Sequence, residues 1–227
     1  MRISEIFESI QGEGMLAGVP SLFLRTSGCN LRCAWCDTPY SSWAPEGEQW
    51  TVEQLAARVE SSPLRHVVIT GGEPMIFADL VPLTQAIHRL GRHITIETAG
   101  TVDAPVACHL MSISPKLSNS TPLEIDGGRW AAMHERARLR PDVLRSLMSR
   151  YEYQLKFVVS SPEDLAEIRT LVHELAAPPD RVLLMPEGTT PETVRERSLW
   201  LAELCRQTGF RYCPRLHILL YGNRRGV

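Results

Sequence analysis

The sequence has no apolar run long enough to cross a membrane, and its start lacks the apolar core of a secretory signal. An excess of one charge is missing too: 24 lysines and arginines stand against 26 aspartates and glutamates, a formal net charge of −2. Such a balance gives no broad electrostatic attraction for nucleic acid. These absences predict a cytoplasmic protein that binds neither membrane nor nucleic acid.

Cysteine is scarce, with six in 227 residues. Six cysteines could form three disulfides, but a chain of this length, 44% hydrophobic, builds a core without covalent staples. Cys108, Cys205 and Cys213 are dispersed, and isolated cysteines are usually small buried hydrophobic side chains. The other three stand close together, which favours metal ligation in a reducing compartment.

These three, Cys29, Cys33 and Cys36, have the spacing C-x3-C-x2-C. An iron–sulfur cubane that only transfers electrons usually takes four cysteines, so three ligands leave one iron open to a reacting molecule. Zinc prefers four ligands and a second pair, which the sequence does not supply. A thioredoxin-like pair would leave Cys29 without a role. The spacing therefore resembles the cluster motif of radical S-adenosylmethionine (SAM) enzymes.

Strand-like and helix-like segments alternate along the chain. The predicted strands are 21–25, 66–70, 93–98, 110–114, 153–159, 182–185 and 215–220. Helices are predicted from capping patterns or helical spacing at four places, namely from Thr51, over 78–90, from Ser161 and from Thr190. Repeated β–α units predict an α/β domain over residues 1–227, with parallel strands, helical crossovers and an irregular insertion at about 117–140. Periodicity alone leaves a partial barrel and an open doubly wound sheet as alternatives.

Polar residues and glycines gather where these predicted strands end. They are the cysteine motif, residues 70–74 (TGGEP), Glu97 with Thr98, residues 114–116 (SPK) and residues 185–188 (MPEG). Each could be a plain turn, and Gly71 and Gly72 could let the backbone approach a ligand because glycine has no Cβ. Carboxyl ends of parallel strands share one edge, where α/β enzymes hold their chemistry. Five such segments together predict one shared site.

Further motifs narrow the resemblance. QGEG occupies residues 11–14, Arg25 lies just upstream of the cysteines, and CDT occupies residues 36–38. IET at 96–98, SPK at 114–116, LH at 216–217 and GN at 222–223 complete the pattern. From about residue 4 to the C-terminus, the chain resembles the 7-carboxy-7-deazaguanine synthase family of the radical SAM superfamily. The cysteine motif belongs to the whole superfamily, whereas QGEG, CDT and SPK are more specific.

The resemblance implies a partial (β6/α3-type) radical SAM barrel and a homodimer. It implies a lyase of queuosine and deazapurine biosynthesis that converts 6-carboxy-5,6,7,8-tetrahydropterin into 7-carboxy-7-deazaguanine with loss of ammonia. The implied cofactors are a 4Fe–4S cluster, SAM and Mg²⁺, and the implied electron donor is flavodoxin-like.

The resemblance also assigns roles to individual positions. Cys29, Cys33 and Cys36 would hold the 4Fe–4S cluster, and Thr38 would bind Mg²⁺. The residues that would line the SAM site are Trp35, Cys36, Asp37, Gly72, Glu97, Ser114, Pro115, Lys116, Met185, Pro186, Glu187 and Gly188. Those that would surround the substrate are Ile10, Gln11, Gly12, Glu13, Arg25, Thr70 and His217.

The residue types suit these roles, although each has a purely structural alternative. The guanidinium of Arg25 has the planar fork that matches a carboxylate, or it could form a salt bridge at a strand edge. Gln11 and Glu13 can pair with the amide and amine edge of a pterin, or residues 11–14 could be a hairpin turn. Trp35 could pack beside adenine, or it could seal a metal cluster from water.

Two other functions stay open at this point. A radical SAM activating enzyme, which makes a glycyl radical on a protein partner, would use the same cysteine spacing. A binding module stabilised by zinc or an inert cluster would leave SAM uncleaved. The QGEG motif and the short chain favour a small-molecule substrate.

Overall fold

The computed structural model describes residues 1–227, and its strands form one sheet in the order β3-β1-β2-β4-β5-β6-β7-β8-β9. The strands are β1 (Arg2–Ile10), β2 (Pro20–Thr26), β3 (Glu48–Gln49), β4 (His66–Gly71), β5 (His93–Thr98), β6 (Leu110–Ile113), β7 (Tyr153–Val159), β8 (Val182–Pro186) and β9 (Arg211–Tyr212).

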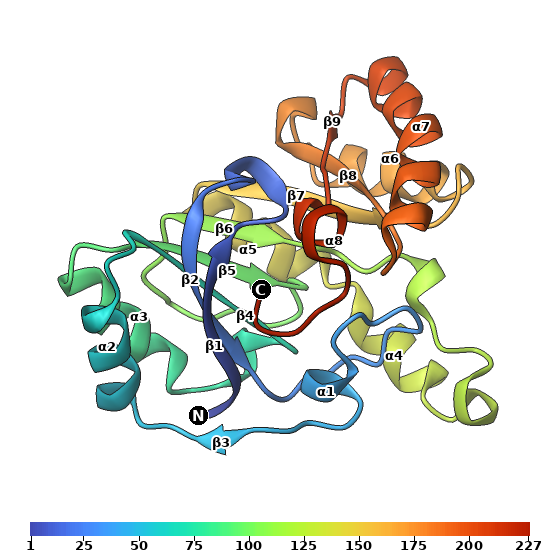
Figure 1. Ribbon diagram of the computed structural model, residues 1–227. Helices are drawn as coiled ribbons and strands as arrows, with labels where there is room; N and C mark the ends of the chain where they lie inside the picture. Colours follow the sequence, from blue (N-terminus) through green and yellow to red (C-terminus); the bar gives the residue numbers. More distant parts are fainter.

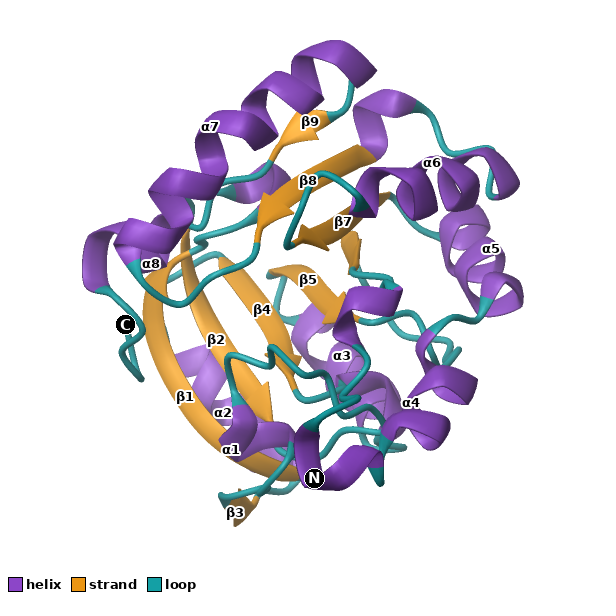
Figure 2. Cartoon of the chain, turned by 90° about the vertical axis from the view of Figure 1, so that its right-hand side faces the viewer, coloured by secondary structure: helices purple, strands orange, loops and turns teal.

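The sheet is parallel from β2 to β9, and these strands lie in the order in which they occur along the chain. A doubly wound sheet reverses its strand order at a switch point, and no reversal occurs here. The sheet is strongly curved in Figures 1 and 2, with β1 and β3 added antiparallel at one edge. The fold is therefore the partial barrel, and that prediction is confirmed.

Helices connect most of the strands. They are α1 (Pro39–Ser42), α2 (Val52–Ser61), α3 (Leu80–Arg89), α4 (Ala131–Arg138), α5 (Pro141–Arg150), α6 (Asp164–Glu174), α7 (Pro191–Thr208) and α8 (Leu216–Tyr221). The longer helices α2, α3, α5, α6 and α7 cover the outer face of the sheet (Figure 2). No helix is long and apolar enough to span a membrane.

The two faces of the sheet differ because successive side chains of a strand point to opposite sides. In β2, Leu22 and Leu24 are completely buried in the core that the helices cover, whereas Phe23 and Arg25 line the inner cavity. Lys156 of β7 also points inward, between core residues on either side. Each large apolar side chain buried on the outer face contributes about 1.5–3 kcal/mol to folding. The inner face is thereby free to carry polar groups.

Most predicted elements are present, and two of the predicted helix starts have the expected caps. The Thr51 hydroxyl accepts a hydrogen bond from the Gln54 backbone N–H (3.2 Å), and the Thr51 N–H donates to the Gln54 side chain (2.9 Å), which completes a capping box. The Thr190 hydroxyl caps α7 by accepting a hydrogen bond from the Thr193 N–H (3.2 Å), without a reciprocal bond. The sequence reasoning missed β1 and α5 entirely.

Two local predictions are wrong. Residues 216–220 lie in helix α8 and Arg215 is its N-cap, so this segment is not the predicted strand. Its burial follows a helical spacing, with Arg215 and Ile218 buried and Leu220 57% exposed. Ser161 is not the N-cap of α6, which starts at Asp164. The carboxylate of Asp164 instead accepts hydrogen bonds from the N–H groups of residues 160 and 161, and this binds the preceding turn to the helix.

Residues 117–140 connect β6 to α5 and contain two short 3-10 turns followed by α4. Fully buried His134 of α4 fixes this connection to the loop that carries the cysteines.

A row of histidines lies at the amino ends of the strands, the end away from the predicted site. The rings of His66 and His93 have centroids 4.6 Å apart, and those of His93 and His109 are 4.9 Å apart. The Nδ1 atoms of His66 and His93 are buried without a hydrogen-bond partner in the chain. Burial, together with the neighbouring His66, His109 and Arg65, lowers the pKa of His93 to about 4.

This row predicts a loss of stability in mild acid. Below the ordinary histidine pKa of about 6.5 the unfolded chain takes up a proton at His93, whereas the folded chain does so only near its own, lower pKa. The free energy of unfolding should therefore fall as the pH is lowered from 6.5 toward 4, and it should fall less in His93→Gln. Urea midpoints at several pH values measure both slopes, with exposed His173→Gln as the control. Equal slopes for the parent and His93→Gln would contradict the assignment.

Candidate active site

One cavity, on the inner side of the barrel, collects most of the residues predicted to be functional. These are Ile10, Gln11, Gly12, Glu13, Arg25, Cys29, Cys33, Trp35, Cys36, Asp37, Thr38, Thr70, Gly72, Glu97, Ser114, Lys116, Met185 and His217. The four predicted residues that do not line it are Pro115, Pro186, Glu187 and Gly188. Glu187 pairs with Arg197 of α7, on the far side of its loop.

The cysteine loop, residues 27–38, follows β2 and is held by the 117–140 connection. The Ala34 N–H donates to the carbonyl of Ser120 (2.8 Å), and the Arg32 N–H donates to Nδ1 of His134 (3.1 Å). Nε2 of His134 lies 2.9 Å from the hydroxyl of Ser120. Burial lowers the pKa of His134 to about 4, so its ring is neutral and can accept the Arg32 hydrogen bond.

The three thiols of the loop share one wall of the cavity. Burial raises the pKa of Cys29 to about 11 and that of Cys33 to about 12. Cys36 Sγ lies 3.1 Å from the Ser42 hydroxyl, and no three Cys, His, Asp or Glu side chains are already gathered as a metal-ligand set. Soft sulfur donors without a fourth cysteine on the cavity wall are the ligand chemistry of an iron–sulfur cluster with an open iron, and cluster binding would displace their protons.

The glycines of the TGGEP motif allow close contact within the chain. A Cβ at Gly71, whose φ is +139°, would lie 2.1 Å from the Thr26 carbonyl oxygen, and one at Gly72 would lie 2.2 Å from that of Gly28. The close approach that these glycines allow in the structure is to backbone, at the end of β2 and in the cysteine loop, whereas the approach to a ligand expected from the sequence stays a prediction; both glycines line the cavity. Glu73 is completely buried and accepts hydrogen bonds from the Thr98 hydroxyl (2.8 Å) and the Ala99 N–H (2.7 Å), which link the ends of β4 and β5.

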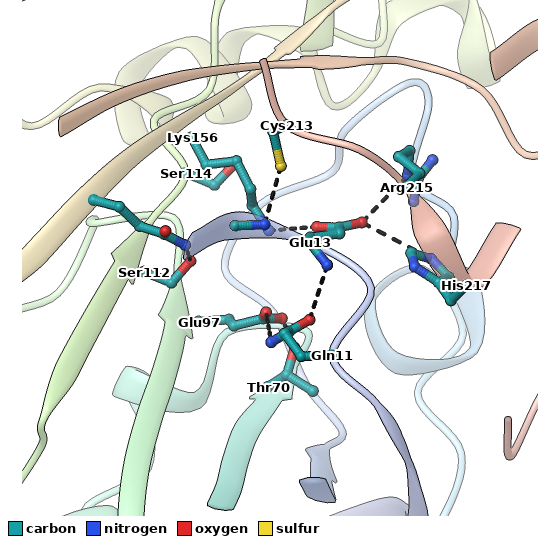
Figure 3. Close-up of polar contacts among 12 residues, drawn as sticks. Gln11, Glu13, Thr70, Glu97, Ser112, Ser114, Lys156, Cys213, Arg215 and His217 are labelled. Atoms are coloured by element: carbon teal, nitrogen blue, oxygen red, sulfur yellow. Dashed lines mark hydrogen bonds and ion pairs between the residues drawn. The ribbon is translucent and has the colours of Figure 1, made fainter. Parts of the chain in front are cut away.

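A polar wall of the same cavity contains two hydrogen-bonded carboxylates, Glu13 and Glu97 (Figure 3). Glu97 accepts hydrogen bonds from the Gln11 amide (3.1 Å) and the Thr70 hydroxyl (2.8 Å). Gln11 and Thr70 are predicted substrate residues, so Glu97, predicted for SAM, lies with the substrate group. The Glu13 N–H donates to Gln11 Oε1 (3.2 Å), which joins the second carboxylate to the first.

Glu13 lies between positive groups. Lys156 donates to one carboxylate oxygen, Arg215 Nε donates to the other (3.2 Å), and His217 Nε2 lies 3.9 Å away. Burial disfavours the charged form, but Lys156 and Arg215 outweigh it and hold the pKa of Glu13 well below its usual range. Glu13 is therefore a carboxylate that accepts hydrogen bonds throughout the physiological pH range.

The glycines of the QGEG motif are required by side chains packed over them. A Cβ at Gly12 would lie 2.0 Å from Nδ1 of His217, and one at Gly14, where φ is +75°, would lie 2.2 Å from Nε2 of Gln154. The motif therefore brings the loop against α8 and β7.

Arg25 shows both of its alternatives at once, since it lines the cavity and also forms a salt bridge. Its Nε lies 2.7 Å from Glu5 Oε2, and its guanidinium carbon lies 5.6 Å from the centre of the Phe7 ring. Trp35 donates to Asn119 Oδ1 (3.2 Å), so the indole is fixed by the 117–140 connection.

Sequence reasoning missed several residues of this site. Lys156 was detectable, because a lysine within the otherwise buried strand YQLKFVV requires a partner. Arg215 and Glu5 gave no such signal, since arginines and glutamates on short segments are usually exposed. Residues 223–227, whose role the sequence left unassigned, also line the cavity.

Three thiols on the inner wall of a partial parallel barrel define a radical SAM protein. In agreement, the family model for the radical SAM superfamily matches residues 23–113. The protein therefore belongs to a class that uses a 4Fe–4S cluster and SAM.

Comparison with known proteins identifies the family. The chain is 48% identical to the 7-carboxy-7-deazaguanine synthase of Rhodopirellula baltica over 99% of this chain and 88% of the relative. It is 44% identical to the 7-carboxy-7-deazaguanine synthase of Halobacterium salinarum, over 97% and 90% of the two chains. The crystal structure of QueE from Escherichia coli superposes with a TM-score of 0.67 at 27% identity, covering 93% of this chain and 92% of that one. The chain belongs to the 7-carboxy-7-deazaguanine synthase family.

The contacts of His134 predict a role in retaining the iron–sulfur cluster. His134→Leu leaves the Arg32 N–H without its partner, at a cost of about 1–3 kcal/mol, and leaves the Ser120 hydroxyl with only its hydrogen bond to the Leu117 carbonyl (2.6 Å). Both losses loosen the cysteine loop. We expect reconstituted His134→Leu to lose iron and sulfide faster on gel filtration than the parent. His173→Leu, an exposed histidine of α6, is the control, and equal iron retention in both variants would refute the role.

Proposed function

We propose that this protein converts 6-carboxy-5,6,7,8-tetrahydropterin into 7-carboxy-7-deazaguanine and releases ammonia. The observation that carries the proposal is that one cavity joins the three thiols to the hydrogen-bonding wall of Gln11, Glu13, Thr70 and Glu97. The names of relatives at 48% and 44% identity support the same reaction.

The polar wall suits a pterin. A pterin presents an amide and an amine edge, which needs fixed acceptors and donors. Glu13 is held ionised, so it can accept hydrogen bonds from amine and ring N–H groups, and Gln11 offers both a donor and an acceptor. Arg25 faces the same cavity and can exchange Glu5 for the substrate carboxylate, which its fork can bind through two parallel hydrogen bonds.

Cys29, Cys33 and Cys36 would hold the 4Fe–4S cluster. When bound, the reduced cluster supplies the electron that cleaves SAM into a radical able to abstract hydrogen from the substrate. The residues of this chain would bind SAM and the pterin, orient them and enclose them. Lys116, whose Nζ donates to the Ser114 carbonyl and hydroxyl (2.8 Å each), lines the cavity and can bind an anionic group of SAM. Phe7 and Phe23, stacked at 4.9 Å, help to keep water from the inner wall.

Thr38 is the proposed Mg²⁺ ligand. It lines the cavity, and Cys36 Sγ lies 3.9 Å from its hydroxyl. A hydroxyl oxygen is a ligand that Mg²⁺ accepts, and substrate oxygens and water would complete the shell.

The working form of the enzyme is proposed as a cytoplasmic homodimer that receives electrons from a flavodoxin-like protein. All six cysteines are free thiols, which fits a reducing compartment.

The reaction is tested by anaerobic reconstitution with iron and sulfide, followed by SAM, reductant, Mg²⁺ and 6-carboxytetrahydropterin. Mass spectrometry should show a product lighter than the substrate by ammonia, and its yield should drop when Mg²⁺ is omitted. Cleavage of SAM without that product would keep the radical chemistry and reject the substrate. Cys33→Ala is the control, since it should form neither the cluster nor the product.

Arg25→Lys tests the carboxylate contact. Lysine keeps the charge but has no planar fork, so we expect KM for the pterin to rise about tenfold or more, the equivalent of about 1.4 kcal/mol, with a smaller change in kcat. Steady-state kinetics with excess SAM give both constants. Arg58→Lys on α2 is the matched control. An unchanged KM in Arg25→Lys would show that Arg25 serves only its salt bridge to Glu5.

A further inference from the structure

Arg215 is a buried arginine that lies behind the wall of the cavity. It is 4% exposed and does not line the cavity, yet its guanidinium reaches three segments that surround it. We propose that Arg215 is a positioning residue that couples the pterin site to the SAM site. This inference rests on the proposed function and adds to it a residue that touches neither ligand.

The geometry assigns one hydrogen bond of Arg215 to each segment. Nε donates to Glu13 Oε1 in the QGEG loop (3.2 Å). One terminal nitrogen donates to Asp37 Oδ2, directly after the last cysteine, and the other donates to the Gly188 carbonyl after β8. The Leu216 N–H, next in the chain, donates to the Gly12 carbonyl (2.8 Å). Glu13 belongs to the predicted substrate group and Asp37 to the predicted SAM group, and both line the cavity, whereas Gly188 does not.

Only arginine can make this arrangement. Its five N–H donors point in different directions within one rigid plane. One side chain can therefore satisfy two carboxylates and a carbonyl at fixed angles. The charges compensate one another: burial disfavours the Arg215 cation, but Asp37 and Glu13 outweigh this and raise its pKa further. Removing the guanidinium would leave Glu13 paired with Lys156 alone. Asp37 would lose its buried cation. Both carboxylates would then reorient.

A coupling between the two ligand sites follows from this shared cation. A ligand that draws Glu13 into one position also fixes Arg215, and Arg215 in turn fixes Asp37 beside Cys36 and Thr38. Binding of the pterin should therefore strengthen binding of SAM, and by linkage SAM should strengthen binding of the pterin by the same factor. Through this coupling, the cysteine loop and the QGEG loop would reach their ligand-binding positions together.

The test measures four dissociation constants on the cluster-loaded protein. SAM binding is measured with and without the pterin, and pterin binding with and without SAM, by equilibrium dialysis in the absence of reductant. In the parent we expect each ligand to tighten the other about fivefold or more. In Arg215→Gln both affinities should fall and the coupling factor should approach one. Arg215→Lys should not restore it, because a single ammonium cannot hold three diverging acceptors. The control is Arg206→Gln, because Arg206 forms an exposed salt bridge with Glu203 near the end of α7.

A second pair of variants keeps the test decisive if Arg215→Gln does not fold. Asp37→Asn should weaken pterin binding, and Glu13→Gln should weaken SAM binding, since each change reaches the other site through Arg215. Wild-type coupling in either Arg215 variant, or the absence of these cross effects, would overturn the inference and leave Arg215 a purely structural residue. A parent that binds SAM but no pterin would instead refute the proposed function, and this inference with it.

Discussion

The buried carboxylate of Glu13, held between Lys156 and Arg215, is the interaction on which the inner architecture depends. Taking one carboxylate and two cations out of water costs several kcal/mol for each ion, and only their mutual attraction and shared hydrogen bonds offset it. The geometry is correspondingly constrained. The QGEG loop must lie under α8, β7 must place a lysine on its inner face, and the chain after β9 must return across the barrel as a helix.

This arrangement is possible because the sheet is curved, with an apolar outer face in the core and an inner face that lines the cavity. Parallel sheets covered on both sides usually have apolar strands throughout. Here β2 and β7 alternate, with Leu22, Leu24 and Phe157 in the core and Arg25 and Lys156 in the cavity. The outer face supplies the stability, and the inner face can then carry buried charge wherever each charged group finds a partner.

The sequence was informative where the constraint was local. The Thr51 capping box and the buried strands are each encoded within a few neighbouring residues and were predicted correctly, and the cysteine spacing was enough to indicate the superfamily. The segment 215–220 was predicted as a strand from its composition, but residues 216–220 are helical, and Arg215 at the N-cap contacts Glu13 and Asp37, which are far away in the chain. The need for glycine at position 12 could not be predicted either, because the side chain that packs over it, His217, comes from the other end of the chain.

The residues that the whole superfamily shares and the residues around Glu13 lie in different parts of the chain. The superfamily model matches residues 23–113, which hold the cysteines, the TGGEP turn and Glu97. Glu13 lies before that stretch, and Lys156, Arg215 and His217 lie after it, yet these four residues meet at one carboxylate. The cysteines that would hold the cluster thus lie within one continuous segment, whereas the group around Glu13 is assembled from both ends of the chain. A substitution at either end can therefore alter the surroundings of Glu13 without replacing a cysteine that would hold the cluster.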